Sequence, residues 1–294
     1  MPVQEKVWTV LDLIKWGADY LTEKGFDEAR LNVELLLSAT LGLKRFDLYV
    51  KHDQPLKKDE LERFKALLKR RLAHEPIQYI LGKTNFYSIE MKVDRRALIP
   101  RPETETLVES VIKLCKTYLS QKDELHILDI GTGSGCIDVA LAKFVKNSRI
   151  ISIDKSKDAL DLANENAKLT KTEEQIRFLQ ADLLNLDENA FERKFDIIVS
   201  NPPYVSELAF KTLAADIKEF EPVDALSDGA DGLTFFKKIS RMARLLLNPG
   251  GYVFVETSFD QAKEVEEIFC EAGGSGVQTS KDLSGIDRVI SARF

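Results

Sequence analysis

Four consecutive residues could hold a planar amino group: Asn201-Pro202-Pro203-Tyr204, which follow an apolar run at 195–199 and Ser200. The two prolines remove two backbone donors and fix two φ angles, so the carbonyl groups of Asn201 and Pro202 are free to point into a crevice. The Asn201 side chain adds an amide oxygen and two donors, and the Tyr204 ring offers a flat apolar face. A stiff surface turn is the alternative interpretation of this motif.

Such a clamp suits one kind of chemistry, the alkylation of a planar nitrogen. The lone pair of an amide or aromatic amine is delocalised, which makes the nitrogen a poor nucleophile. Acceptors that bind both of its N–H groups raise its electron density and aim it at an electrophilic methyl group. No catalytic histidine is required, and none of the three histidines lies in an evident site. We therefore expect Asn201, Pro202 and Tyr204 to be the catalytic residues.

A glycine-rich segment follows the apolar run at 126–130 and reads Gly131-Thr132-Gly133-Ser134-Gly135. Three glycines in five residues allow a sharp turn and a close approach of a ligand to the backbone. The spacing differs from the GxGxxG of dinucleotide sites, and no Lys-Ser or Lys-Thr follows as in a phosphate-binding loop. The segment predicts a ligand-binding turn between a strand and a helix, with a plain turn as the alternative.

Acidic residues at the ends of neighbouring apolar runs indicate which ligand this turn binds. Asp154 lies 23 residues after Gly131, where nucleotide-binding folds place a carboxylate for the ribose hydroxyl groups; capping of the next helix is the alternative. Asp182 ends the third run, at the sheet edge where an adenine amino group would lie. Without a phosphate cradle or a basic clamp, the ligand is adenosine-like. S-adenosylmethionine fits, with its amino group near Asp129.

The elements that must position these motifs alternate between strand and helix. Short apolar runs lie at 126–130, 150–153, 176–179, 195–199 and 252–255. Helical patterns separate most of them, at 136–146, 156–168, 233–247 and 260–272. This alternation predicts an α/β fold with a mainly parallel, doubly wound sheet. A turn at 282–285 and a strand at 288–294, with no helix before it, predict an antiparallel final hairpin.

Residues 1–83 read as a separate helical domain, because apolar residues recur at helical spacing and Gly25 and Gly42 stand where C-terminal caps belong. The helix expected at 58–72 has a basic side, which is either a solvated face or a docking surface for an anionic partner. Residues 84–101 are predicted to be a hairpin and extended linker. Residues 102–294 are predicted to be the catalytic domain, with Pro102 opening its first helix.

Composition and charge exclude several classes of protein. The 294 residues are 44% hydrophobic and 31% charged, and no apolar run approaches the roughly 20 residues of a membrane-spanning helix. No signal peptide is recognisable, nothing calls for a metal, and three cysteines without a CxxC pair favour the reducing cytoplasm. Residues 84–294 hold 27 basic and 35 acidic side chains, which weighs against a nucleic-acid substrate.

Several further motifs, together with the two loops, resemble the release factor glutamine methyltransferases, the PrmC or HemK family. They are 75–82 (EPIQYILG), 98–105 (LIPRPETE), 220–222 (FEP) and 287–289 (DRV). The resemblance covers nearly the whole chain. It implies the class I S-adenosylmethionine-dependent methyltransferase fold, with a seven-stranded, mainly parallel sheet and an antiparallel last strand. A small all-α N-terminal domain is expected to precede it.

The resemblance also implies an activity. The family transfers a methyl group from S-adenosylmethionine to the side-chain nitrogen (N5) of the glutamine in the Gly-Gly-Gln loop of peptide chain release factors 1 and 2. The products are N5-methylglutamine and S-adenosylhomocysteine. The alternatives are methylation of a glutamine in a ribosomal protein, of an amino group on a nucleic-acid base, or a non-catalytic protein that binds S-adenosylmethionine.

Site residues follow from the same resemblance. The glycine loop would wrap the methionine part of S-adenosylmethionine, and Asp154 would bind its ribose. Asp182 and Leu183 would flank the adenine. Asn201 would contact both the glutamine amide and the methyl donor. The residues that hold or surround the amide would be Asn201, the Pro202 carbonyl group, Pro203 and Tyr204. The segment 98–105 would help close the site, and the N-terminal helices would dock the release factor.

Three departures from the family pattern affect local packing. Ser88 stands where a glycine is usual, so the turn in the linker is expected to differ. The segment 256–259 (ETSF) replaces a more common Glu-Ile-Gly. Asp138 lies in the helix after the glycine loop, where an apolar residue is more common. None of the three is expected to touch the Asn-Pro-Pro-Tyr clamp.

Overall fold

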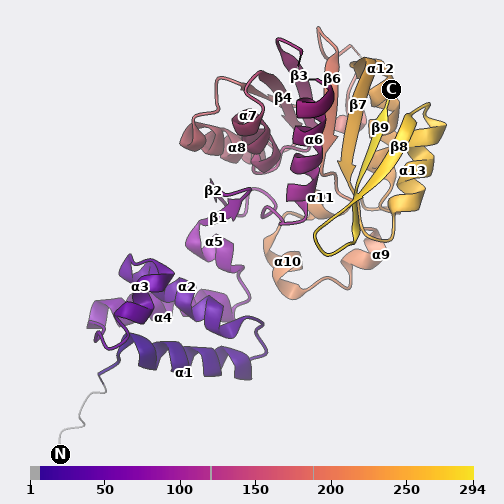
Figure 1. Ribbon diagram of the computed structural model, residues 1–294. Coiled ribbons are helices and arrows are strands. Elements are labelled where there is room, and N and C mark those ends of the chain that lie inside the picture. Colours follow the sequence, from indigo (N-terminus) through magenta and orange to yellow (C-terminus); the bar gives the residue numbers. More distant parts are fainter. Residues whose placement is uncertain (1–6, 120, 188) are drawn as a thin grey trace, which may run out of the picture. The chain divides into compact units, whose positions relative to one another are not determined.

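The computed structural model describes residues 7–119, 121–187 and 189–294. The chain divides into two compact units, Met1–Gly82 and Lys83–Phe294 (Figure 1). Buried apolar side chains form one cluster in the N-terminal unit, and two large clusters in the second unit. Within the described ranges, we find no helix with the length and apolar character needed to cross a membrane.

Helices build the N-terminal unit. They are α1 (Val10–Glu23), α2 (Ala29–Leu41), α3 (Arg45–Val50), α4 (Lys58–Leu72) and α5 (Ile77–Leu81). Thr9 and Asp12 form a capping box at the start of α1, and Gly42, in the left-handed conformation, ends α2. The apolar stripes of α1, α2 and α4 meet in one core that includes the fully buried Val33 and Phe64.

A β-hairpin opens the second unit, formed by β1 (Lys83–Phe86) and β2 (Ile89–Lys92). Its turn residues Tyr87 and Ser88 have φ of 50° and 61°, the left-handed conformation that a two-residue hairpin turn requires. The Tyr87 N–H donates to Glu105 Oε1 at 2.8 Å, which stabilises this turn without a glycine. The hairpin packs into the same core as the sheet that follows.

A seven-stranded sheet forms the centre of the second unit, as far as the described residues go, and it confirms the predicted fold class. Its strands are β3 (Leu125–Ile130), β4 (Ser148–Asp154), β5 (Ile176–Gln180), β6 (Phe195–Ser200), β7 (Leu247–Glu256), β8 (Ser275–Lys281) and β9 (Asp287–Arg293). They lie in the order β5-β4-β3-β6-β7-β9-β8, and β9 runs antiparallel to both neighbours. The strand order reverses between β3 and β6, the place where ligands bind in such sheets.

Helices cover both faces of this sheet (Figure 1). On one face lie α6 (Thr104–Tyr118), α7 (Cys136–Phe144) and α8 (Lys157–Thr170), and on the other α12 (Thr234–Leu246) and α13 (Ala262–Glu271). Successive strand residues point to opposite faces, so Ile127 joins the first core and Leu128 the second. The helix expected to open at Pro102 begins at Thr104, because residues 102–103 form a turn.

Four short elements lie in the connections of the sheet. They are η1 (Leu183–Asn185), α9 (Glu207–Phe210), α10 (Ala215–Phe220) and α11 (Val223–Leu226). The first follows β5, and the other three lie between β6 and α12. All four are too short to produce a readable periodicity, so the sequence did not predict them.

Candidate active site

A cavity of about 230 Å³ lies at the carboxyl ends of β3, β4 and β6, where the two motifs meet. Most of the predicted site residues line it, namely Gly131, Thr132, Gly133, Ser134, Asp154, Asp182, Leu183, Asn201, Pro202 and Pro203. The other predicted residues, Asp129, Gly135 and Tyr204, lie outside its lining. Among the described residues, no group of His, Cys, Asp and Glu is arranged to hold a metal ion.

The backbone fastens the glycine loop to strand β4. The N–H groups of Gly131 and Thr132 donate to the Ile153 carbonyl oxygen at 2.8 and 3.1 Å. The three glycines of the loop have φ of 81°, 54° and 77°, which residues with a side chain rarely adopt. A Cβ on Gly135 would lie 2.9 Å from the Ala163 Cβ on α8. This glycine therefore also allows the loop and α8 to pack closely.

Asp154, at the end of β4, ties the glycine loop to the start of α8. Its Oδ2 accepts from the Gly133 N–H at 2.9 Å, and its Oδ1 accepts from the Ser156 N–H at 2.8 Å. Ser156 is the N-cap of α8. Because a carboxylate has about four lone-pair sites, this capping role leaves sites for the hydroxyl groups of a ligand in the cavity.

Asp182 and Leu183 follow β5 and start η1. Asp182 Oδ1 accepts from the Leu184 N–H at 3.0 Å, and its Oδ2 accepts from Asn185 Nδ2 at 2.7 Å. These bonds fix the turn in which the Leu183 side chain is buried while still lining the cavity. A carboxylate next to a buried leucine can accept from an amino group and pack against a flat ring.

The Asn-Pro-Pro-Tyr loop begins where β6 ends beside β3. The Ser200 hydroxyl donates to the Ile130 carbonyl oxygen at 2.7 Å, which joins the ends of the two strands. Asn201 Nδ2 donates to Thr104 Oγ1 at 3.1 Å, so the first residue of α6 holds this amide. Pro202 is buried and Pro203 is half-buried. Both therefore present a rigid backbone to the cavity.

Tyr204 is anchored beside the cavity. Its hydroxyl donates to Glu256 Oε1 at 3.2 Å, and its carbonyl oxygen accepts from Gln261 Nε2 at 3.0 Å. Burial, reinforced by the Glu256 carboxyl group, raises the pKa of Tyr204, so the phenol stays protonated. Gly232, with φ of 85°, passes so close that a Cβ there would overlap the Tyr204 carbonyl oxygen. Use of the Tyr204 ring as a stacking face stays a prediction.

A buried carboxyl pair lies next to the glycine loop. Asp129 of β3 and Asp138 of α7 have no exposed surface. Burial raises the pKa of both groups, and the neighbouring Asp138 raises that of Asp129 further. Two interacting carboxyl groups cannot both ionise, so the pair retains a proton at neutral pH. The expected contact between Asp129 and the amino group of a ligand stays a prediction.

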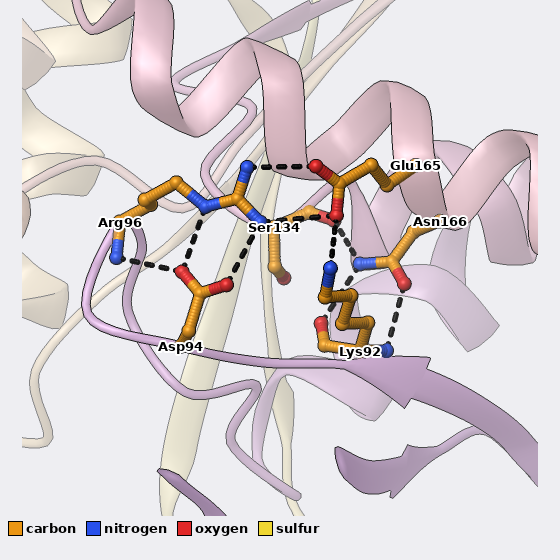
Figure 2. A network of polar contacts seen from close by, with 6 residues as sticks. All are labelled: Lys92, Asp94, Arg96, Ser134, Glu165 and Asn166. Atoms are coloured by element: carbon orange, nitrogen blue, oxygen red, sulfur yellow. Dashed lines mark hydrogen bonds and ion pairs between the residues drawn. The ribbon is translucent and has the colours of Figure 1, made fainter. Parts of the chain in front are cut away.

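Arg96, in the cavity wall, anchors the segment before α6 to helix α8. Figure 2 shows its guanidinium group between two carboxylates, Asp94 at 2.8 Å and Glu165 at 2.9 Å. The hydrogen bonds from Arg96 lower the pKa of Glu165 to about 2, so this carboxylate is ionised at any physiological pH. Both partners hold the guanidinium group in one place.

Asn166 joins the same segment to the glycine loop (Figure 2). Its Oδ1 accepts from the Lys92 N–H at 2.7 Å, and its Nδ2 donates to the Lys92 and Ser134 carbonyl oxygens, both at 2.9 Å. The side chain is fully buried on α8. One amide therefore fixes the end of the hairpin and the glycine loop relative to each other.

An ion pair joins two motifs that the sequence showed separately. Arg101 Nη2 lies 2.6 Å from Glu221 Oε1, and Glu221 Oε2 accepts from the Ile99 N–H at 3.2 Å. Arg101 and Ile99 both line the cavity, and Glu221 is only 5% exposed. The segment 98–105 is thereby bound to the segment 220–222 at the edge of the cavity.

Sequence reasoning missed several residues that support the site: Thr104, Asn166, Gly232, Glu256 and Gln261. Thr104 and Glu256 lay in segments that the sequence had singled out, and Glu256 ends an apolar run as the predicted acidic residues do. Asn166 and Gln261 carried no local signal, because both fell in predicted amphipathic helices, where a polar residue is usually solvated.

Known proteins resemble this chain over both units. Residues 12–82 match the PrmC N-terminal domain, and residues 121–283 match a methyltransferase domain. The chain is 41% identical to a Chlorobaculum tepidum protein named release factor glutamine methyltransferase, over 98% of both chains. It is 39% identical to a Geobacter sulfurreducens protein of the same name, over 100% of both.

A solved structure agrees with the fold. A methyltransferase from Pyrococcus furiosus aligns with a TM-score of 0.51 and 19% identity, covering 76% of this chain and 96% of the other. At this identity the likeness supports the architecture alone. The fold, the methyltransferase domain and the relatives together identify S-adenosylmethionine as the methyl donor. By its identity with these relatives over nearly its full length, the chain belongs to the release factor glutamine methyltransferase family.

Proposed function

We propose that this chain methylates the side-chain amide nitrogen of the glutamine in the Gly-Gly-Gln loop of peptide chain release factors 1 and 2. The methyl group comes from S-adenosylmethionine, and the products are N5-methylglutamine and S-adenosylhomocysteine. The name shared by the relatives supports a release factor as substrate. One observation carries the proposal. Asn201 lines the same cavity as the glycine loop, and its Nδ2 is bound to Thr104 Oγ1 at 3.1 Å.

The cavity fits the methyl donor, which supplies an electrophilic methyl sulfonium group when bound. Residues 131–135 would enclose its methionine part, because three left-handed glycines expose the backbone without a Cβ. Asp154 would accept the ribose hydroxyl groups on its remaining lone-pair sites. Asp182 and Leu183 would flank the adenine. Asp129, buried beside the loop, would act on the donor's amino group at a distance.

Asn201 and Pro202 would bind the acceptor amide. The Asn201 side-chain oxygen and the Pro202 carbonyl oxygen would each accept one N–H of the glutamine amide, while Pro203 and Tyr204 shape the surrounding pocket. Fixed acceptors orient the delocalised nitrogen and raise its electron density, so the rate gain comes from positioning and electrostatics. No histidine is among the described residues that line the cavity. In this mechanism the nitrogen loses its proton after transfer.

The N-terminal unit would dock the release factor through α4. The exposed basic residues of this helix are Lys58, Arg63, Lys65, Lys69 and Arg70. Two of them already have acidic partners, because the Arg70 guanidinium group binds Glu75 at 2.7 Å and Arg63 lies 3.4 Å from Asp59. The basic surface is therefore smaller than the sequence suggests, and it would meet an acidic patch of the partner. A substrate that works on the ribosome would place the enzyme in the cytoplasm.

Transfer of label from S-adenosylmethionine tests the substrate. Four acceptors are compared: a release factor, the same factor with its loop glutamine changed to alanine, a ribosomal protein mixture and bulk nucleic acid. We expect label on the first alone. Label on ribosomal protein or nucleic acid instead would overturn the substrate assignment.

Asn201→Ala tests the clamp. We expect it to lower the rate by about 10²–10³-fold, while donor binding, measured by calorimetry, is retained. A fully active variant contradicts the mechanism.

A further inference from the structure

A chain of buried polar groups lies behind the Asn201 clamp. Glu256, at the end of β7, is 1% exposed, and Thr104, at the start of α6, is 2% exposed. The Thr104 hydroxyl interacts with the Glu256 carboxyl group and also accepts a hydrogen bond from Asn201 Nδ2 at 3.1 Å. The Tyr204 hydroxyl donates to the same carboxyl group at 3.2 Å. The last residue of the acceptor loop is therefore bound to Glu256 directly, and its first residue is linked to Glu256 only through Thr104.

The donors and acceptors in this series of polar contacts follow from which groups carry protons. An ionised carboxylate only accepts hydrogen bonds, so in its interaction with Glu256 the rotatable Thr104 hydroxyl turns its hydrogen toward the carboxylate. The Thr104 oxygen then has only lone pairs left for Asn201, and only the NH₂ end of that amide can donate to them. Rotating the Asn201 amide by half a turn would place two oxygens against each other.

We propose that Glu256, acting through Thr104, is a positioning residue that holds Asn201 with its amide oxygen toward the substrate. This inference rests on the proposed function and deepens it. The two ends of an asparagine amide have nearly the same shape, so packing alone does not select one orientation. In the reversed orientation Asn201 would present N–H groups to the N–H groups of a glutamine. The selected orientation also rejects a glutamate side chain, whose carboxylate would face the acceptor oxygens.

The protonation of Glu256 provides a second readout. Burial raises the pKa of Glu256 to about 7, against the opposing effect of the Thr104 and Tyr204 hydroxyl groups. Among the other titratable groups, Glu103 raises the pKa of Glu256 and Arg288 lowers it. Glu256 in turn raises the pKa of Cys136. A protonated Glu256 can donate to Thr104, which frees the Thr104 hydroxyl to donate to the Asn201 oxygen. The orientation of the Asn201 side-chain amide is therefore fixed above about pH 7 and lost below it.

Thr104→Val tests the proposal, because valine keeps the shape of threonine and removes the hydroxyl. We expect kcat for release factor methylation to fall about 10- to 100-fold, with the Kd for S-adenosylmethionine changed less than twofold. Thr104→Ser is the matched control; it keeps the hydroxyl and should restore most of the rate. Circular dichroism and Tm establish that both variants are folded. A wild-type kcat in Thr104→Val, or equal losses in both variants, would overturn the proposal.

Glu256→Gln separates positioning from a purely structural role. In the wild type kcat should decline below about pH 7, and this decline should disappear in the variant, because glutamine does not titrate there. An unchanged pH profile contradicts the role of Glu256. The parallel assay of Asn201→Ala distinguishes the two levels of the argument. If Asn201→Ala is active, the clamp itself is wrong; if it is inactive while Thr104→Val is fully active, only the positioning role is wrong.

Discussion

The two loops that meet in the cavity are held by different means. The glycine loop, 131–135, is bonded mainly to the backbone of the next strand and to Asp154 at its end. The acceptor loop, 201–204, is held by side chains from distant segments, among them Thr104, Glu256 and Gln261. The donor site is thus a local property of consecutive strands and helices, whereas the acceptor clamp depends on the assembly of the whole sheet.

Gly135→Ala should have the largest effect on the glycine loop. A φ of 77° is expected to cost an alanine about 1–2 kcal/mol. The overlap with Ala163 is expected to cost about 1–3 kcal/mol more. We expect the free energy of unfolding to fall by about 3 kcal/mol, and the affinity for S-adenosylmethionine to fall with it. Urea unfolding and calorimetry measure the two quantities.

Gly133→Ala is the matched control for this variant. Gly133 has φ of 54°, but a Cβ there would have no neighbour closer than 4.0 Å. Backbone strain alone should then lower the free energy of unfolding by about 1 kcal/mol. Equal losses in the two variants would show that close packing against α8 is not the reason for glycine at position 135.

Gly232→Ala tests the acceptor loop in the same way. Its Cβ would overlap the Tyr204 carbonyl oxygen, at a φ of 85°. We expect a loss of about 2–3 kcal/mol in the free energy of unfolding and a large loss of kcat with donor affinity retained. Gly229→Ala, at a φ of 70° with no atom within 4 Å, is the control. If the affinity of Gly232→Ala for S-adenosylmethionine falls by the same factor as kcat, the two loops are not held independently.

Asn166→Leu removes a buried side chain that joins the glycine loop to the hairpin. Three hydrogen bonds to the backbone are lost, and two carbonyl groups lose a donor. We expect a loss of about 2 kcal/mol in the free energy of unfolding. Arg96→Ala breaks the more exposed ion pairs of the same network and should cost about 1 kcal/mol or less. If chemical denaturation shows a larger loss for Arg96→Ala than for Asn166→Leu, the ion pairs and not the Asn166 amide hold the hairpin to α8.

Asp138→Asn should change the free energy of unfolding by a small amount that depends on pH. Burial raises the pKa of Asp138, so the folded chain binds more protons than the unfolded chain above about pH 4. The free energy of unfolding therefore falls as pH rises toward neutrality. Asparagine does not titrate, so the variant should gain about 1–2 kcal/mol over the wild type at pH 8 relative to pH 5. A difference that does not vary with pH would contradict the retained proton.

The sequence predicted the placement of the glycine loop better than the contacts that hold the acceptor loop, and the binding roles of both loops stay predictions. Glycine content, strand ends and helix caps are local signals, so the loop, Asp154 and the sheet followed from them. The pairing of Asn201 with Thr104 depends on where α6 begins, which was misplaced. The pairing of Tyr204 with Glu256 depends on register, because Ser200 lies opposite Val255 in the neighbouring strand. Register between strands cannot be deduced from either strand alone.

The sequence likewise did not predict to which face of the sheet the Asp129 side chain points. An interaction of this carboxylate with the amino group of the ligand stays a prediction, and in the structure its neighbour is Asp138 of α7, on the face of the sheet to which strand alternation turns it. The apolar run before it does not show this, because both faces of a parallel sheet are buried.

The position of β9 constrains how the protein folds during its synthesis. This strand, 287–293, lies between β7 and β8 and hydrogen-bonds to both. Until it leaves the ribosome, β7 has a bare edge and β8 has no partner in the sheet, a state that favours aggregation or chaperone binding. The donor loop belongs to strands made much earlier. A nascent chain could therefore shape its nucleotide pocket well before Glu256 is locked in place for the acceptor.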